Sequence, residues 1–143
     1  MPYRYLENIA TADIAFDAWA NTVEELFIES ADALLNVMVE DLDSIRNVES
    51  KSVQLSNDAL DFLLFDVLQE IIYYKDAARL LLRLNDVEIT NNENLFGFKA
   101  IARGEPICQN RHKLAADVKA VTFHDFAVST DGQLWSAHVI LDI

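Results

Sequence analysis

The sequence contains little of what extracellular, membrane-spanning or loop-rich proteins use. Its 143 residues include one cysteine, three glycines and two prolines. A lone cysteine excludes a disulfide framework within the chain, so we expect a reducing, cytoplasmic environment. The first residues lack the apolar core of a signal peptide. The most apolar stretch, 59–73, is interrupted by acidic and amide side chains, which argues against a membrane span.

Positive charge is scarce as well. Eleven Lys and Arg residues stand against 24 Asp and Glu residues, which gives a formal net charge of −13. Such a surface repels nucleic acid, so we expect no direct nucleic-acid binding over the general surface. The charge fits a cation site, a basic protein partner or adaptation to high salt, and composition alone does not choose among them.

Catalytic motifs are absent too. The sequence has no glycine-rich phosphate loop, no zinc-ligand spacing and no recognisable Ser-His-Asp arrangement. The three histidines are scattered along the chain, and a lone histidine is more often structural than a ligand. We therefore expect that the protein is not an enzyme.

The length and the 52% hydrophobic composition predict one domain, residues 1–143, with a substantial core. Thr22-Val23-Glu24-Glu25 is a capping box that predicts a helix to about residue 39. A second helix is predicted from about 58 to 75, and the rest of the chain reads as strands, with a bulge at Asn85-Asp86. The expected fold class is α+β, with two helices packed on one face of a mostly antiparallel or mixed sheet.

The stretch Leu141-Asp142-Ile143 follows an alternating apolar run and reads as the end of a strand. That placement sets the Asp142 side chain beside the main-chain carboxylate of Ile143. The pair offers hard oxygen ligands for Mg²⁺, Mn²⁺ or Ca²⁺ if another acid comes near. Asp41, in the acidic turn after the first helix, is a candidate additional ligand, because carboxylates are unfavourable at a helix C-terminus. Solvated charges at both places are the alternative interpretation.

Asp131-Gly132 predicts a two-residue hairpin turn. With that turn, Val121 pairs with Asp142, and Lys119 lies diagonally from Asp142 on the same face. The pair is then either a cross-strand ion pair that fixes the register or a cation beside a ligand site.

The same hairpin would place His138 opposite Asp125. Upstream, a loop carries a local basic cluster in this acidic chain, and either partner contact or plain solvation explains it. The cluster comprises Arg103, Arg111, His112 and Lys113.

Several motifs, taken together in this order and spacing, resemble the archease family over nearly the whole chain. They are Thr11-Ala12-Asp13-Ile14, Thr22-Val23-Glu24-Glu25-Leu26-Phe27, Val118-Lys119-Ala120-Val121-Thr122 and Val139-Ile140-Leu141-Asp142-Ile143.

The resemblance implies a protein that assists the RtcB-type RNA ligase of tRNA splicing and RNA repair. Members of the family are thought to promote guanylylation of the ligase and so allow multiple turnover, without being ligases themselves. The family's metal site falls on Asp13, Asp142 and Ile143, which implies a bound divalent cation (Ca²⁺, Mg²⁺ or Mn²⁺). Contact with the ligase or its nucleotide is expected at Lys119 and also at Arg111, His112 and Lys113.

The chain departs from the family pattern at two positions. Ala10 stands where the family motif has histidine, and Ala20 where glycine is frequent. Two other functions remain open: a general chaperone or modulator of RNA-processing proteins that needs no metal, and a small metal-dependent hydrolase of phosphate esters.

Overall fold

The computed structural model describes residues 2–6 and 13–143. The described elements follow one another along the chain as β1 (Tyr3–Leu6), β2 (Asp13–Ala20), α1 (Val23–Met38), the short 3₁₀ turn η1 (Leu42–Ser44), β3 (Glu49–Asn57), α2 (Leu60–Ala78), β4 (Leu80–Asn92), β5 (Leu95–Pro106), β6 (Ala120–Thr130) and β7 (Trp135–Asp142).

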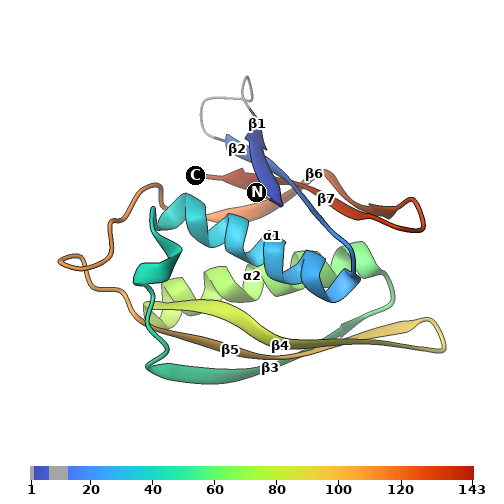
Figure 1. The fold of residues 1–143 in the computed structure, drawn as a ribbon, viewed down its shortest axis with the longest axis horizontal. Coiled ribbons are helices and arrows are strands. Elements are labelled where there is room, and N and C mark those ends of the chain that lie inside the picture. The colour runs from blue at the N-terminus through green and yellow to red at the C-terminus, as the bar shows by residue number, and fades with distance from the viewer. Residues whose placement is uncertain (1, 7–12) are drawn as a thin grey trace.

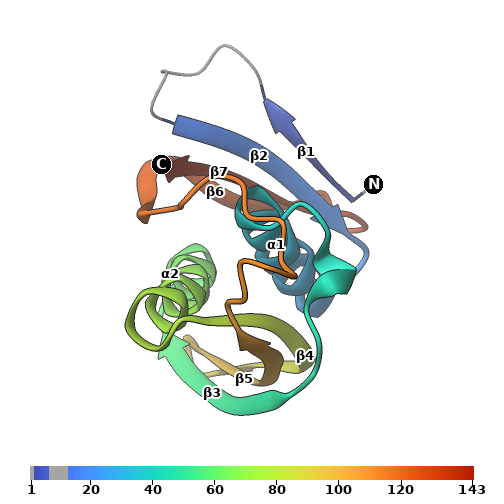
Figure 2. The ribbon, with the colours of Figure 1, turned by 90° about the vertical axis from the view of Figure 1, so that its left-hand side faces the viewer.

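The strands form two antiparallel sheets, with the orders β1-β2-β7-β6 and β3-β5-β4. Both helices lie between the two sheets, as Figures 1 and 2 show. The α+β class is confirmed, but the strands are divided between two sheets rather than joined in one. Each helix is therefore covered on two sides, which explains why the apolar arc of each is so broad.

Helix α1 begins where the capping box predicts. The Thr22 hydroxyl accepts a hydrogen bond from the Glu25 backbone N–H at 3.1 Å, which satisfies a donor at the open end of the helix. Within the helix, Phe27 is fully buried and stacks on Phe98 of β5, with ring centroids 5.7 Å apart. Leu34 and other buried residues join the same core, so α1 connects the two sheets.

Helix α2 fixes the start of β6 through one buried lysine. The Lys75 ammonium donates to Asp117 Oδ1 at 2.5 Å and to the Val118 carbonyl at 2.8 Å. Burial alone would lower the pKa of Lys75, but hydrogen bonds to Asp117 and Asp76 raise it above its ordinary value. The lysine thus stays charged and anchors the segment that leads into β6.

The β6–β7 hairpin differs from its predicted register. Thr130 pairs with Trp135, so the loop has four residues and is not a two-residue turn. Farther along, the pairing shifts between Thr122 and Ala127. The longer loop and the interruption in β6 both insert residues without a partner. Each insertion changes which residues of β6 and β7 lie opposite one another.

These shifts overturn three predicted placements. Ala120 faces Asp142 in place of Val121, and Ala127 faces His138 in place of Asp125. The shared face of Lys119 and Asp142 rested on the same wrong pairing. The bulge predicted at Asn85-Asp86 is confirmed by a register shift between Asn85 and Glu88.

In the described part of the chain, neither helix combines the length and the apolarity that crossing a bilayer requires.

Candidate functional site

Two aspartates face each other where β2 and β7 pair. Asp13 begins β2 and lies directly opposite Asp142 near the end of β7. Strand alternation turns Phe16 and Ala18 of β2 into the core, so Asp13 lies on the outer face of the four-stranded sheet, away from the helices. Both aspartates are half-buried. Two positions far apart in sequence are thus brought side by side on rigid strands.

This pair has no counter-charge among the residues that the structure describes: no Lys, Arg or His side chain there forms an ion pair with Asp13 or Asp142. Like charges directly opposite each other on neighbouring strands are destabilising. The nearby Lys119 contributes its backbone instead, because its N–H donates to the Asp142 carbonyl at 2.8 Å. Its side chain is exposed.

The donor atoms suit a hard divalent cation. Directly opposed residues hold their Cβ atoms about 4.5–5.5 Å apart, a spacing at which two carboxylates can share one ion. Within the described ranges, no three His, Cys, Asp or Glu side chains gather at one point. Among the described residues, Asp13 and Asp142 thus supply two carboxylates, and further oxygens would come from the main chain or from water. The residue types fit Ca²⁺, Mg²⁺ or Mn²⁺.

Asp41 does not join this pair. Its side chain caps η1 and accepts a hydrogen bond from the Asp43 backbone N–H at 3.0 Å. The carboxylate closes a local turn, as Asp often does, and the role of Asp41 as an additional ligand stays a prediction.

The predicted basic cluster divides into buried and exposed members. His112 is only 1% exposed. Its Nδ1 accepts from the Cys108 backbone N–H at 2.9 Å, so the proton lies on Nε2, which donates to Glu105 at 3.0 Å. Arg111 pairs with the same carboxylate and donates to the Ser44 carbonyl at 2.7 Å. His112 is thus buried within the protein, and the Arg111 side chain is already bound to Glu105 and to the Ser44 carbonyl.

Lys113 differs from these two neighbours. Its side chain is exposed and pairs with Glu40 at 3.1 Å, so it remains accessible to a partner.

The centre of this network is Glu105, to which the sequence analysis assigned no role. It is 3% exposed and lies at the end of β5, in a stretch expected to be a loop. Burial would raise its pKa, but hydrogen bonds from the Arg46 backbone N–H, Arg111 and His112 lower it to about 2. The sequence signal for this network was an acidic residue at position 105 followed, a few residues later, by the neighbouring Arg111 and His112.

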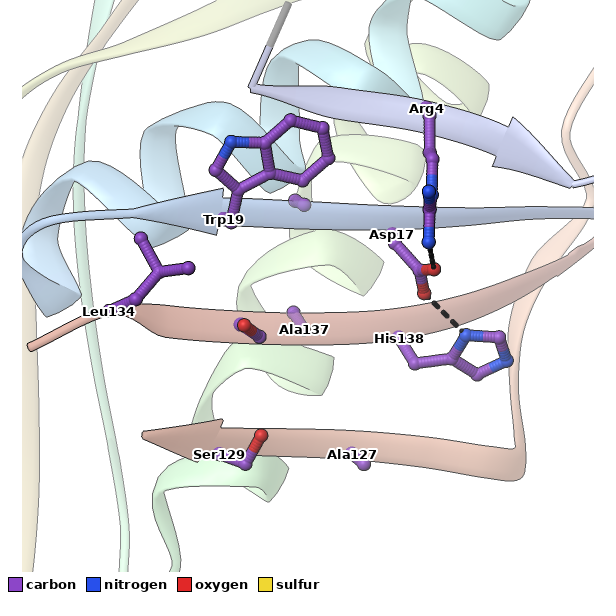
Figure 3. A pocket seen from close by; sticks show the side chains of 10 residues that line it. Arg4, Asp17, Trp19, Ala127, Ser129, Leu134, Ala137 and His138 are labelled. Atoms are coloured by element: carbon purple, nitrogen blue, oxygen red, sulfur yellow. Dashed lines mark hydrogen bonds and ion pairs between the residues drawn. The ribbon is translucent and has the colours of Figure 1, made fainter. Parts of the chain in front are cut away.

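A second feature occupies the outer face of the four-stranded sheet. A hollow of about 480 Å³ lies there. Figure 3 shows the two interactions that cross it, from Arg4 on β1 to Asp17 on β2 and from Asp17 to His138 on β7. Asp17 Oδ1 lies 2.7 Å from His138 Nδ1, and Asp17 Oδ2 lies 3.5 Å from Arg4. Trp19 borders the hollow. Asp17 and Asp13 belong to one strand face, about 13 Å apart along β2.

Comparison with known proteins identifies the fold and the family together. The model of the Archease protein family (MTH1598/TM1083) matches residues 3–143. The chain belongs to the archease family.

Curated archease relatives match the chain at full length. Protein archease from Methanopyrus kandleri is 34% identical over 143 residues, covering 100% of both chains. Protein archease from Methanosarcina mazei is 33% identical over 142 residues, covering 99% of this chain and 95% of the relative.

Two solved archease-family structures share the architecture. The solution structure of Methanobacterium thermoautotrophicum protein 1598 superposes with a TM-score of 0.85 at 29% identity and covers 99% of each chain. The crystal structure of a Thermotoga maritima archease, described as a possible chaperone, has a TM-score of 0.65 at 22% identity and covers 96% of this chain and 97% of its own. At that identity the second likeness shows the fold alone.

The family motif that ends in Asp13 begins outside the described residues. Ala10, the departure from the family's histidine, lies there, and so do Thr11 and Ala12.

Proposed function

We propose that this archease-family protein activates an RtcB-type RNA ligase in tRNA splicing and RNA repair, and that it acts by binding the ligase without catalysing a reaction itself. The observation that carries the proposal is the placement of Asp13 opposite Asp142 with no basic partner in the described ranges. A pair of carboxylates held rigidly and left without counter-charge is suited to a divalent cation.

Asp13, Asp142 and the main-chain carboxylate of Ile143 would hold the ion. A bound divalent cation supplies positive charge that neutralises phosphate oxygens during nucleotidyl transfer. The two strands fix the carboxylates. Lys119 binds the Asp142 carbonyl through its backbone, and its exposed side chain is a candidate contact for a phosphate or an acidic ligase residue. Because Lys113 is also exposed, it is a further candidate contact, whereas His112 is enclosed within the protein.

The net charge of −13 supports a protein partner rather than RNA as the direct ligand. Repulsion from the RNA backbone would keep this surface away from nucleic acid, while a basic rim around a nucleotide-binding cleft would attract it.

The decisive experiment measures guanylylation of the cognate RNA ligase with GTP, with and without this protein. We expect stimulation by the wild-type chain, loss of stimulation with chelator, and loss with Asp13→Ala or Asp142→Ala. The matched control is Glu93→Ala, which removes one negative charge at the β4–β5 turn of the other sheet. Wild-type stimulation by both aspartate variants would refute the role of the metal site.

The part played by Ile143 has its own test. Two residues added after Ile143 would move the main-chain carboxylate away from Asp142 while keeping both aspartates. We expect weaker cation binding and weaker stimulation from the extended chain, and unchanged values would remove Ile143 from the ligand set.

A general chaperone role is the alternative, and the description of the Thermotoga maritima relative as a possible chaperone favours it. It predicts suppression of the aggregation of unrelated, heat-denatured proteins, unaffected by chelator or by Asp142→Ala. Stimulation of the ligase that disappears with chelator would separate the proposed function from this alternative.

A further inference from the structure

Four phenylalanines gather where α2 packs beside β6. Phe65 and Phe123 stack with ring centroids 3.9 Å apart. Phe62 meets Phe123 edge-on at 5.8 Å, and Phe126 meets Phe65 edge-on at 5.6 Å. Phe123 is nevertheless 60% exposed and Phe62 46% exposed. We call these four residues the aromatic cluster. Large aromatic side chains that remain exposed in a group are typical of interaction sites.

The backbone of β6 departs from regular pairing at this cluster. In a regular strand, positions 123 and 126 point to opposite faces. Here the ladder with β7 is interrupted between Thr122 and Ala127, and Asp125 adopts a positive φ of 54°. As a result, Phe123 and Phe126 both contact Phe65. The strand gives up ladder hydrogen bonds and accepts an unfavourable backbone conformation, and its rings are left partly in water.

Acidic residues dominate the two segments that supply the cluster, although His124 lies 3.4 Å from Asp125. Segments 58–74 and 120–134, which supply α2 and β6 at this surface, contain no Lys or Arg. They contain six acidic residues, namely Asp58, Asp61, Asp66, Glu70, Asp125 and Asp131. Nucleic acid would be repelled by these segments, and so would a second copy of the same surface. The surface that complements this cluster is therefore a protein surface with an apolar side chain surrounded by Lys or Arg residues.

The aromatic cluster and the carboxylate pair are linked through β6, the cluster on the side of α2 and the pair on the outer face. Ala120, at the start of β6, faces Asp142 on β7. From Ala120 to Phe123 the strand advances about 10 Å. Because β6 is the edge strand of its sheet, a protein that covers the cluster would reach the outer face, where Asp13 and Asp142 lie, by extending around the edge of β6.

We propose that the aromatic cluster is the docking surface for a basic protein surface that carries an apolar anchor, and that this surface belongs to the RNA ligase. The inference rests on the proposed function. In this arrangement the aromatic rings supply most of the binding energy, the acidic residues steer the basic partner, and the carboxylate pair lies at the adjacent end of β6.

The test is titration calorimetry of the purified cognate ligase against the full chain, combined with the guanylylation assay. Phe62→Ser/Phe123→Ser should raise the dissociation constant at least about thirtyfold, as the loss of interface aromatics does. Tyr73→Ser is the matched control, because Tyr73 is 58% exposed on the same helix, contacts Tyr74 and lies outside the cluster. It should bind like the wild type. Circular dichroism and Mn²⁺ binding should be unchanged in every variant.

A second variant covers the case in which the phenylalanine substitutions disturb folding. Asp61→Asn/Asp125→Asn removes two charges and leaves the rings in place, and Asn tolerates the positive φ at position 125. It should weaken binding by a smaller factor and flatten the dependence of binding on salt concentration.

The outcomes separate the two proposals. If the wild type stimulates and binds the ligase while both double variants also bind with the wild-type dissociation constant and salt dependence, the docking surface is refuted and the proposed function stands. If the wild type neither binds nor stimulates, both proposals fail. If sedimentation shows a dimer that Phe62→Ser/Phe123→Ser dissociates, the occupant is a second copy of this chain and the basic-partner proposal is overturned.

Discussion

At the end of β5, the Glu105 carboxylate is enclosed by donors from the Arg46 backbone, Arg111 and His112. At the paired ends of β2 and β7, Asp13 and Asp142 face each other without a basic partner in the described part of the chain. Both places combine acidic side chains with rigid surroundings. They differ in whether the protein itself satisfies the charge.

The difference separates a structural charge from a candidate functional one. A carboxylate that the fold has already saturated with hydrogen bonds has little to offer a ligand, whatever its burial. Two carboxylates left opposite each other raise the energy of the folded state, and a cation can relieve that repulsion. Perturbing each group should therefore change different properties of the molecule.

The largest effect is expected from removing Glu105. Glu105→Ala leaves the buried His112 N–H without an acceptor and removes the carboxylate partner of the half-buried Arg111, so we expect a loss of about 3–5 kcal/mol in the free energy of unfolding. Urea denaturation measures this, with Glu88→Ala on the exposed side of β4 as the control, expected within about 0.5 kcal/mol of the wild type. A change below about 1 kcal/mol in Glu105→Ala would show that the network is not structural.

The same carboxylate should make stability depend on pH. Its pKa in the folded protein is about 2, below the ordinary 4.5, so its contribution is complete above about pH 4.5 and is lost as the pH falls toward 2. Glu105→Gln removes this titration. The unfolding free energy of the wild type should therefore fall more steeply between pH 4.5 and 3 than that of Glu105→Gln, measured by urea titration at each pH. Parallel pH profiles would contradict the assignment.

Divalent cations should stabilise the other region. If Asp13 and Asp142 hold Ca²⁺, Mg²⁺ or Mn²⁺, a concentration one hundred times the dissociation constant stabilises the wild type by about 2.7 kcal/mol. Asp13→Asn/Asp142→Asn should lose this response, whereas Glu105→Gln should keep it. Chemical denaturation with and without each cation measures the difference, and an equal response in all three chains would place the binding elsewhere.

The smallest expected effect is a gain in stability, whereas most mutations destabilise a protein. Without divalent cations, Asp142→Asn relieves the repulsion from Asp13 and should raise the free energy of unfolding by about 0.2–1 kcal/mol. Urea denaturation in chelator detects this gain. Destabilisation by Asp142→Asn under those conditions would mean that the Asp142 charge has a favourable partner.

Local sequence signals predicted the local structure well. Thr22 specified the start of α1 because capping depends on neighbouring residues alone, and the change of phase at Asn85-Asp86 predicted the β4 irregularity for the same reason. The division into two sheets was not predicted. Alternation shows which side chains of a strand point inward, but it does not show which strand lies beside it.

The hairpin register failed for a related reason. Asp131-Gly132 was a valid turn signal, yet the loop continues through Gln133 and Leu134, where the Asp131 side chain accepts two backbone hydrogen bonds. The interruption near Asp125 added a second displacement. Register is cumulative along a ladder, so each irregularity displaces every later pair.

For the site, the family motifs led to Asp13 and Asp142, and the structure places them opposite each other, while their role as metal ligands stays a prediction. The roles of Arg111 and His112 could not be predicted. Both depend on Glu105, whose own burial requires the Arg46 backbone from 59 residues earlier in the chain. A basic cluster in sequence was in fact half of an ion-pair network in space.

The position of β7 has a consequence for how the molecule folds. β7 follows all other strands in sequence but lies between β2 and β6, so the four-stranded sheet stays divided until the strand inserts. Contacts of such long sequence separation slow folding, because much chain entropy is lost before they form. A cation shared by Asp13 and Asp142 would then cross-link β2 to β7 and close a loop that comprises nearly the whole chain. The ion would bind tightly only after β7 has inserted between β2 and β6. Once bound, it would slow the detachment of β7 and so lengthen the lifetime of the native state.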